Sequence, residues 1–149
     1  MNQKLRNQVI SHFAEDWGVS SPQFSVCEKI FDYLLSRPTN QLKHLTHGSL
    51  KVAIGEYRSD GDVLRAIQYL CGDRTPVLSL HFEFVDNEDN YHPLKDDDIR
   101  DAKRTGKLVH PETGEYVENF EDKVLMYFTP SSLVQEVIDG SWRVKLKPT

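Results

Sequence analysis

The sequence of 149 residues lacks the features that define several large protein classes. No apolar run approaches the roughly 20 residues that a membrane-spanning helix needs, and the polar N-terminus has no apolar core of a signal peptide. Only two cysteines, Cys27 and Cys71, are present, and both lie among apolar residues in predicted helices. We therefore expect buried thiols in a reducing compartment, and thus a cytoplasmic protein.

Motifs of the common catalytic and cofactor-binding classes are also absent. The eight glycines are spread singly, and the sequence has no phosphate-binding loop, dinucleotide fingerprint or nucleophile elbow. Cys71 ends a predicted helix and Cys27 lies on an apolar helix face, and neither position favours a thiolate nucleophile. We therefore predict a protein that is not an enzyme and binds no cofactor.

The composition is that of one globular domain, residues 1–149. Apolar residues make up 38% and charged residues 28%, as in folded proteins. The net charge is −5, and residues 86–101 alone carry seven acids and two bases, so the rest of the chain is neutral. Such a charge run is typical of a solvated loop, and it would repel DNA from any surface beside it.

Apolar residues at helical spacing predict two helices in the first quarter of the chain. The first helix, which Gly18 ends, has one apolar stripe formed by Leu5, Val9, Phe13 and Trp17. The second is strongly amphipathic. It is capped by Ser21 ahead of Pro22 and stops before Pro38.

Two shorter helices are expected next, after residues 41–46, which fit either a strand or a turn of helix. Ser49 is the expected cap of a helix over residues 50–57. Another helix follows over residues 62–71. Its buried face is assigned to Leu64, Ile67 and Leu70.

Alternating hydrophobicity predicts a strand over residues 77–85. One face of this strand is expected to be buried through Leu78, Leu80, Phe82 and Phe84. The acidic segment that follows has helical spacing over residues 94–104, and residues 107–117 indicate a hairpin with its turn at 111–114.

The last part of the chain has three expected elements. A nearly continuous apolar run predicts a second strong strand over residues 123–128. A helix begins after Pro130. Residues 141–147 alternate apolar and basic side chains, as an edge strand does.

In this order the elements resemble a winged helix-turn-helix domain. The resemblance is carried by a positioning helix (residues 49–57), a turn (58–61) and a recognition helix (62–71). Two wing strands, residues 77–85 and 123–128, complete it. It implies an α+β fold in which residues 22–86 and 121–129 form a winged-helix-like core of helices and a small antiparallel sheet. Residues 1–21 would add an N-terminal helix, and residues 130–149 a C-terminal helix and edge strand.

The resemblance departs from the family in its wing, which is normally a short loop. Here residues 87–120 would form an insertion with a helix and a hairpin of its own. Loops of this length are usually functional, so the insertion is the first place to look for function.

The resemblance also implies that the recognition helix enters the major groove of DNA. Asp62 would face outward at the helix start, and the candidate nucleic-acid contacts are Arg65, Gln68, Tyr69 and Arg74. Residues 59–86 hold two bases and five acids, whereas DNA readers surround this helix with cations because phosphate contacts supply most of the affinity. Winged helices also serve as protein-binding modules, which suits this charge pattern better.

Metal-binding patterns are weak. His44 and His47 are three residues apart and could share a helical face, but zinc needs three or four ligands. His81, His92 and His110 could join them only through the fold. The acidic run lacks the glycine and the closing glutamate of a calcium loop, because Tyr91 and Asp97 stand in those positions. We therefore predict no metal site, with surface histidines and a solvated acidic loop instead.

Aromatic residues in the insertion, including Phe120, either pack a small core of its own or anchor a partner. We predict an accessory or adaptor subunit that binds a partner protein and does not bind a membrane. The residues expected to contact the partner are Tyr91, Asp96, Asp97, Asp98 and Tyr116. The alternative is a DNA-binding transcriptional regulator that forms a homodimer through its first helix or its C-terminal elements. A metal-dependent or other enzyme that uses the histidines and acids is the third hypothesis.

Overall fold

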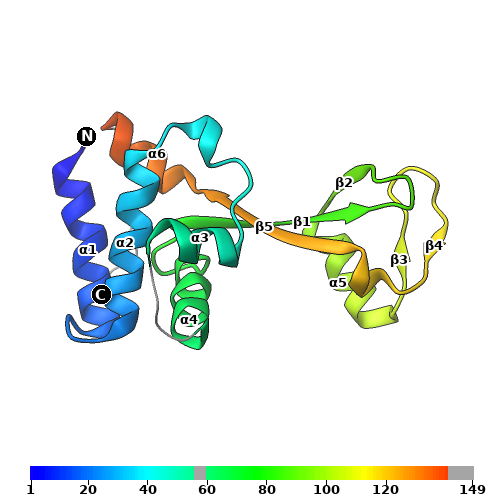
Figure 1. The fold of residues 1–149 in the computed structure, drawn as a ribbon, viewed down its shortest axis with the longest axis horizontal. Coiled ribbons are helices and arrows are strands. Elements are labelled where there is room, and N and C mark those ends of the chain that lie inside the picture. Colours follow the sequence, from blue (N-terminus) through cyan, green and yellow to red (C-terminus); the bar gives the residue numbers. More distant parts are fainter. Residues whose placement is uncertain (56–59, 141–149) are drawn as a thin grey trace. The chain divides into compact units, whose positions relative to one another are not determined.

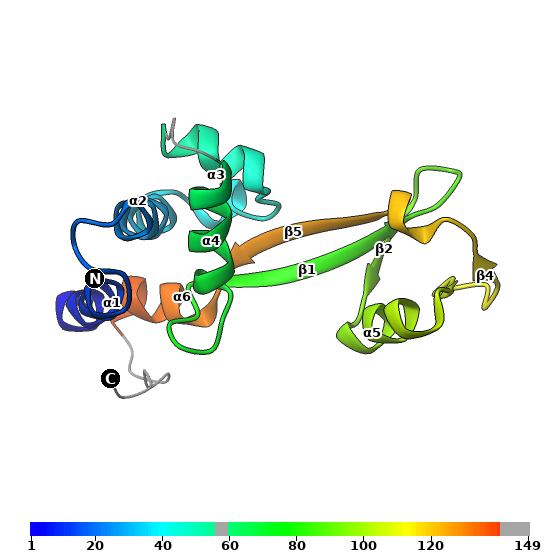
Figure 2. The same ribbon diagram turned by 90° about the horizontal axis from the view of Figure 1, so that it is seen from below.

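The structure, a computed structural model, describes residues 1–55 and 60–140 (Figure 1). Within them, helices combine with a small antiparallel sheet, and the predicted α+β class is confirmed. The sheet has the order β2-β1-β5, and its strands are β1 (Leu78–Val85), β2 (Tyr91–Leu94) and β5 (Val124–Pro130). Figures 1 and 2 show β1 and β5 side by side.

The described residues form two compact units. The first, the helical unit, takes Met1–Ser79 and the residues from Phe128 onward. The second, the lobe, takes Leu80–Tyr127. Because β1 and β5 contribute residues to both units, the lobe contains part of each strand in addition to the predicted insertion over residues 87–120.

The helical unit is built around α2, which packs against α1, α4 and α6. Its elements are α1 (Gln3–Trp17), α2 (Pro22–Ser36), the 3₁₀ turn η1 (Thr39–Gln41), α3 (His47–Ala53), α4 (Asp60–Leu70) and α6 (Ser132–Asp139). The stripe predicted for α1 is buried at Leu5, Val9 and Phe13, and the Phe13 ring meets Phe31 of α2 edge to face at 6.0 Å. These residues belong to one continuous apolar core.

Side-chain caps determine where the helices begin. Ser21 caps α2 as predicted, because its Oγ accepts the Phe24 N–H at 3.1 Å, and Gly18 ends α1 with a positive φ of 83°. The predicted cap of α3 is wrong. Thr46 caps this helix through its Oγ1, which accepts the Ser49 N–H at 3.0 Å, while Ser49 Oγ accepts the Thr46 N–H at 2.8 Å. This reciprocal pair satisfies two otherwise unpaired donors.

Residues 41–46 contain the end of a 3₁₀ turn and then an extended residue, Leu45, which bonds to Phe128 of β5. The Leu45 N–H donates to Phe128 O at 2.9 Å, and the Phe128 N–H donates to Leu45 O at 2.7 Å. The extended segment before α3 is therefore tied to β5.

The predicted buried face of α4 is wrong at Leu64, which is 42% exposed. The buried residues are Val63, Ala66, Ile67 and Leu70. They follow the i, i+3, i+4, i+7 pattern of a helix stripe. The predicted residues are instead spaced by three, and this spacing drifts around a helix of 3.6 residues per turn. The helix expected over residues 50–57 begins earlier, at His47, and ends earlier, at Ala53. The turn expected at residues 58–61 lies partly outside the described residues, and the edge strand expected at 141–147 lies wholly outside them.

The lobe has a second, smaller core formed by Phe84, Ala102, Leu108 and Phe120. Its further elements are α5 (Asp96–Thr105), β3 (Leu108–Val109), β4 (Tyr116–Val117) and the 3₁₀ turn η2 (Phe120–Asp122). β3 and β4 form the predicted hairpin. The expected burial of β1 is wrong at Leu80, which is 39% exposed, because Leu78 lies in the first core and Phe84 in the second.

Among the described residues, no helix is both long enough and apolar enough to cross a membrane.

Candidate functional site

The turn between β1 and β2 is organised by Asp86. Its Oδ1 accepts the backbone N–H groups of Glu88 and Asn90, both at 2.9 Å. Asp89 adopts a positive φ of 61°, a conformation that aspartate tolerates better than most residues. The sequence Asp86–Asn90 therefore folds into a tight turn around one carboxylate, and Asp86 Oδ2 remains for other contacts.

His92 of β2 faces Asp86 across this turn. Its Nε2 lies 2.8 Å from Asp86 Oδ2, and it carries the proton of this hydrogen bond because a carboxylate only accepts. The His92 ring is buried and stacks on Phe84, which is its partner in the β1–β2 register. On its other side, Nδ1 lies 3.5 Å from Glu112 Oε1. Both ring nitrogens therefore face carboxylates.

His110 reaches the same carboxylate from the hairpin. It follows β3, and its Nε2 lies 3.9 Å from Asp86 Oδ2. Its Nδ1 accepts the N–H groups of Glu112 at 3.1 Å and Thr113 at 3.3 Å, as part of the hairpin turn. Because Nδ1 is an acceptor, the ring proton of neutral His110 lies on Nε2, toward Asp86.

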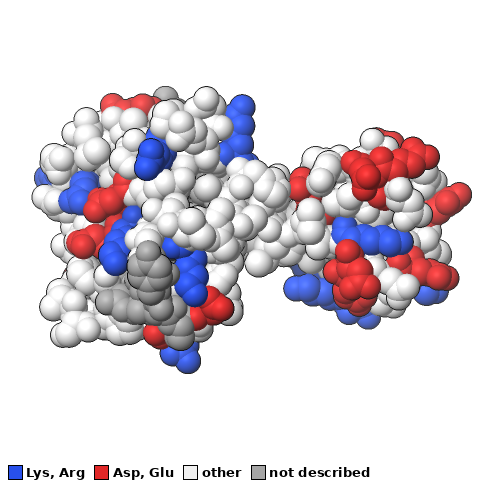
Figure 3. Space-filling view, in the orientation of Figure 1, with Lys and Arg blue, Asp and Glu red and all other residues white. Residues whose placement is uncertain are grey.

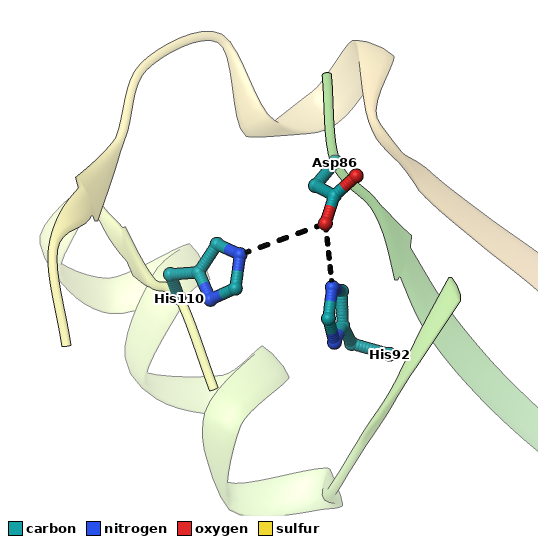
Figure 4. A group of neighbouring side chains, drawn as sticks. All are labelled: Asp86, His92 and His110. Carbon is teal, nitrogen blue, oxygen red and sulfur yellow. Dashed lines mark hydrogen bonds and ion pairs between the residues drawn. The ribbon is translucent and has the colours of Figure 1, made fainter. Parts of the chain in front are cut away.

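Asp86, His92 and His110 form a compact cluster in which one carboxylate lies between two imidazoles. Figure 4 shows their three side chains pointing toward one another. The hydrogen bond from His92, with those from the backbone of Asn90 and Glu88, holds the pKa of Asp86 well below its usual value. Asp86 is therefore ionised at neutral pH, and its carboxylate can accept a hydrogen bond or bind a cation.

A polar pocket of about 230 Å³ adjoins the cluster. Asp86 and His110 line it together with Thr113, Glu115 and Lys123. A small polar ligand or water at this position would therefore lie next to the carboxylate and one imidazole.

The three aspartates predicted to bind a partner form the first turn of α5. Asp98 Oδ2 accepts the Lys95 N–H at 3.0 Å and so caps the helix, and Asp97 forms an exposed ion pair with Arg100 at 3.2 Å. Asp96 is also exposed. Acids in a first helical turn complement the helix dipole, so these residues have a structural role as well as a predicted binding role.

The two tyrosines predicted to bind a partner are exposed. Tyr91 is 61% exposed and Tyr116 is 69% exposed. Tyr116 pairs with Val109 across the β3–β4 hairpin, and Val109 is 49% exposed. Phe120, in contrast to the two tyrosines, packs into the core of the lobe. Tyr116 and Val109 thus form an apolar cross-strand pair on the surface.

The α4 residues predicted to contact DNA separate into two groups. Arg65 and Gln68 are exposed. Tyr69, by contrast, packs against Phe13 and Trp17 of α1 and donates its hydroxyl proton to Asp16. The outward orientation predicted for Tyr69 is therefore wrong, since its ring covers α1.

Arg74 and Asp62 are also engaged within the helical unit. Arg74 forms ion pairs with Asp16 at 3.0 Å and Glu15 at 3.3 Å. Asp62 Oδ1 accepts a hydrogen bond from Gln23 Nε2 at 3.0 Å. On this face, the guanidinium of Arg74 is neutralised by carboxylates of α1.

Both cysteines are free thiols. Burial raises the pKa of Cys27 to about 12 and that of Cys71 to about 11. Both thiols therefore stay protonated at neutral pH. Cys27 is buried as predicted, whereas Cys71 is only partly buried against the same core.

The cluster of Asp86, His92 and His110 was not selected from the sequence. His92 lies on β2, a strand of four residues that no sequence pattern indicated, and its pairing with β1 is what brings it to Asp86. Among the described residues, His44, His47 and His81 join no group of three metal-ligating side chains. The sequence signals were the position of His110 next to the predicted hairpin turn at 111–114 and the count of His92 and His110 among histidines that only the fold could bring together.

Comparison with known proteins gives no relative: no family model, no curated protein and no solved structure matches this chain.

Proposed function

We propose that this protein is a non-enzymatic accessory or adaptor module with a winged-helix core, which binds a partner protein through its lobe. The observation that carries this proposal is the exposed pair Val109 and Tyr116 on a lobe of strongly negative charge. The cytoplasm is the proposed compartment, because Cys27 and Cys71 are free thiols.

The order of elements supports the winged-helix assignment. A helix, α2, is followed by an extended residue at Leu45, by helices α3 and α4, and by strands β1 and β5. The two backbone hydrogen bonds between Leu45 and Phe128 form an isolated antiparallel bridge that places the extended segment before α3 beside β5. This is the arrangement that the resemblance to a winged helix-turn-helix domain implies.

The exposed apolar residues of the lobe support a binding role. Tyr116 and Val109 lie on the hairpin and Tyr91 on β2, and all three leave about half or more of their surface in solvent. Tyrosine is enriched among the residues that contribute most to protein interfaces, because it buries a large apolar ring and keeps a polar end. The amine of Lys107 lies 5.0 Å from the centre of the Tyr116 ring, which orients the ring at the surface.

Charge indicates the kind of partner. The lobe, Leu80–Tyr127, contains thirteen acids and six bases, a net charge of −7. The remaining residues contain ten acids and twelve bases, a net charge of +2. Figure 3 shows the acidic side chains distributed over the visible face of the lobe, with basic side chains between them. A partner protein with a basic surface would be attracted to the lobe and repelled by few of its groups.

DNA binding is supported less well. Of the cations in residues 60–74, Arg65 projects from the exposed face of α4, whereas Arg74 is paired with Asp16 and Glu15. A single outward arginine is far from the basic surface that phosphate contacts require.

The test is affinity capture followed by reconstitution. Full-length protein and the double variant Val109→Ser with Tyr116→Ser would be used to capture proteins from a lysate, and a protein lost with the variant would be purified and its Kd measured. We expect the double variant to bind at least about 30-fold more weakly, since interface anchors contribute about 2 kcal/mol or more, and we expect the wild-type affinity to fall with added salt.

The matched control is Ile138→Ser, which changes an exposed apolar residue of the helical unit. This control should retain wild-type affinity. A purified partner that bound wild-type protein, the lobe variant and a deletion of residues 86–120 with equal affinity would refute binding through the lobe.

A further inference from the structure

Three metal-ligating groups converge in the lobe (Figure 4). Asp86 Oδ2 lies 2.8 Å from His92 Nε2 and 3.9 Å from His110 Nε2, and one donor atom of each residue lies within 4.8 Å of those of the other two. In a tetrahedral zinc site, bond lengths of about 2.0–2.2 Å put the donors roughly 3.3–3.5 Å apart. The two separations to Asp86 lie on either side of this value, and the histidine donors lie within 4.8 Å of each other, so the side chains must shift for the three donors to reach it.

We propose that Asp86, His92 and His110 form a binding site for one divalent transition-metal ion of the zinc class. The ligand atoms are Asp86 Oδ2 and the Nε2 atoms of both histidines. Two imidazoles and a carboxylate suit zinc and its neighbours, whereas magnesium and calcium prefer oxygen ligands throughout. Three protein ligands leave a fourth position for water or another small donor, and Asp86 and His110 border the polar pocket of about 230 Å³.

The surroundings of Asp86 and His92 fit this role. Asp86 Oδ1 is held by the backbone N–H groups of Glu88 and Asn90, so the carboxylate presents Oδ2 to the site. His92 Nδ1 lies 3.5 Å from Glu112 Oε1. A histidine that binds a metal through one nitrogen usually donates the proton of its other nitrogen to a carboxylate or carbonyl, which fixes the ring. Glu112 supplies this carboxylate.

Aromatic packing holds both imidazoles in place. The rings of His92 and His110 contact each other with centroids 4.8 Å apart. Phe84 stacks on His92 at 5.8 Å and meets His110 edge to face at 5.2 Å. Because Phe84 belongs to the core of the lobe, the ligand rings are positioned by packing before any ion binds.

His92 Nε2 donates its proton to Asp86 Oδ2 in the structure, so metal binding through this atom moves the proton to Nδ1, which faces Glu112. His110 must also change its tautomer to bind the metal. Without metal, its Nδ1 accepts the N–H groups of Glu112 and Thr113, and the ring proton is on Nε2. Coordination through Nε2 displaces this proton, and a neutral metal-bound ring carries its proton on Nδ1. The two turn hydrogen bonds are then broken, so metal binding at this site must perturb the amides of Glu112 and Thr113.

The test uses full-length protein without a histidine tag, stripped of metal by a chelator. We expect calorimetric titration with Zn²⁺ to give one-to-one binding, and Co²⁺ to give the visible spectrum of a four-coordinate site. In NMR spectra, the amide signals of Glu112 and Thr113 should move on addition of Zn²⁺. This measurement is made on the isolated chain, so its outcome is independent of the proposed partner.

Ligand variants test the assignment of the site. His110→Ala and Asp86→Asn should each weaken Zn²⁺ binding by at least about 100-fold, and Glu112→Gln by about 10-fold. His81→Ala is the matched control, because His81 lies in the lobe but stacks on Tyr127 outside the cluster; it should bind Zn²⁺ as the wild type does. Wild-type protein that took up no zinc at one-to-one stoichiometry, or bound it equally in His81→Ala and His110→Ala, would overturn the proposal.

Discussion

Arg74 holds Asp16 of α1 in an ion pair, with Arg74 Nε 3.0 Å from Asp16 Oδ2. Tyr69 of α4 donates its hydroxyl proton to the same carboxylate. Burial acts to raise the pKa of Asp16, but the hydrogen bonds from Arg74 and Tyr69 outweigh it, and the pKa of Asp16 is lowered. Two residues that the sequence marked as candidates for DNA contact thus fasten α1 to the rest of the helical unit.

Replacing this carboxylate should therefore destabilise the protein in a pH-dependent way. We expect Asp16→Asn to lower the free energy of unfolding by about 1 kcal/mol at pH 7, because the group is partly exposed. The pKa is lower in the folded state, so the stabilisation is complete above the unfolded-state value of about 3.9 and disappears as the pH falls through the folded-state value. Urea unfolding of both proteins at pH 7 and at about pH 2.5 measures it, and a difference that persisted unchanged in acid would contradict the assignment.

The nearby variant Glu15→Gln serves as a comparison for Asp16→Asn. Glu15 contacts Arg74 at 3.3 Å and its side chain is 46% exposed. Exposed ion pairs contribute little, so this change should lower the free energy of unfolding by less than about 0.5 kcal/mol.

Because the protein has two separate cores, we expect a cavity-forming substitution in one core to destabilise mainly the unit that contains it. Leu108 is buried in the small core of the lobe, and Leu34 in the core of the helical unit. Leu108→Ala should cost about 2–5 kcal/mol of local stability through the cavity it leaves. Hydrogen exchange should then accelerate in lobe amides while α2 amides stay protected.

Leu34→Ala is the reciprocal variant. It removes the same number of atoms from the larger core, and it should accelerate exchange in α1, α2 and α4. If Leu108→Ala accelerated exchange in α2 and the lobe equally, the two units would unfold together, and the cavity would not act locally.

Local signals account for the parts of the fold that the sequence predicted. In α2, the cap Ser21 and the following Pro22 lie next to a long apolar stripe, so the sequence specifies both the start of the helix and its buried face. The hairpin of β3 and β4 was likewise indicated by the turn residues between them. These elements depend on neighbours along the chain.

The parts that were missed depend on pairing between distant residues. β2 has four residues, one of which is Pro93, and it is defined by its register opposite β1. His92 reaches Asp86 only because it lies opposite Phe84 in this register. In the same way, Leu64 is exposed because α2 contacts the neighbouring stripe of α4. Spacing along one element does not reveal which partner it will meet.

Thiol reactivity provides a test of the first core. Burial raises the pKa of Cys27 to about 12, so we expect no labelling by a thiol reagent at about pH 8 in native protein and full labelling in denaturant. The variant Cys71→Ser isolates the signal of Cys27. The pKa of the Cys27 thiol is higher in the folded state than in the unfolded state. The buried, protonated thiol therefore contributes its full stability below the unfolded-state value of about 8.5, and this contribution is lost as the pH rises toward 12. Rapid native labelling of Cys27 would show that the core between α1 and α2 opens readily.

The exposed face of α4 leads to the last prediction, which concerns DNA. Arg65 and Gln68 project from this face beside Leu64, and Arg74 is held by Asp16 and Glu15. One outward arginine neutralises at most one phosphate, whereas tight DNA binding uses about 6–10 such contacts. Fluorescence anisotropy with a random-sequence duplex at about 50 mM salt should therefore show no complex. Binding that fell steeply with added salt and disappeared in Arg65→Ala would instead support a DNA reader, and the acidic lobe would then have to lie away from the duplex.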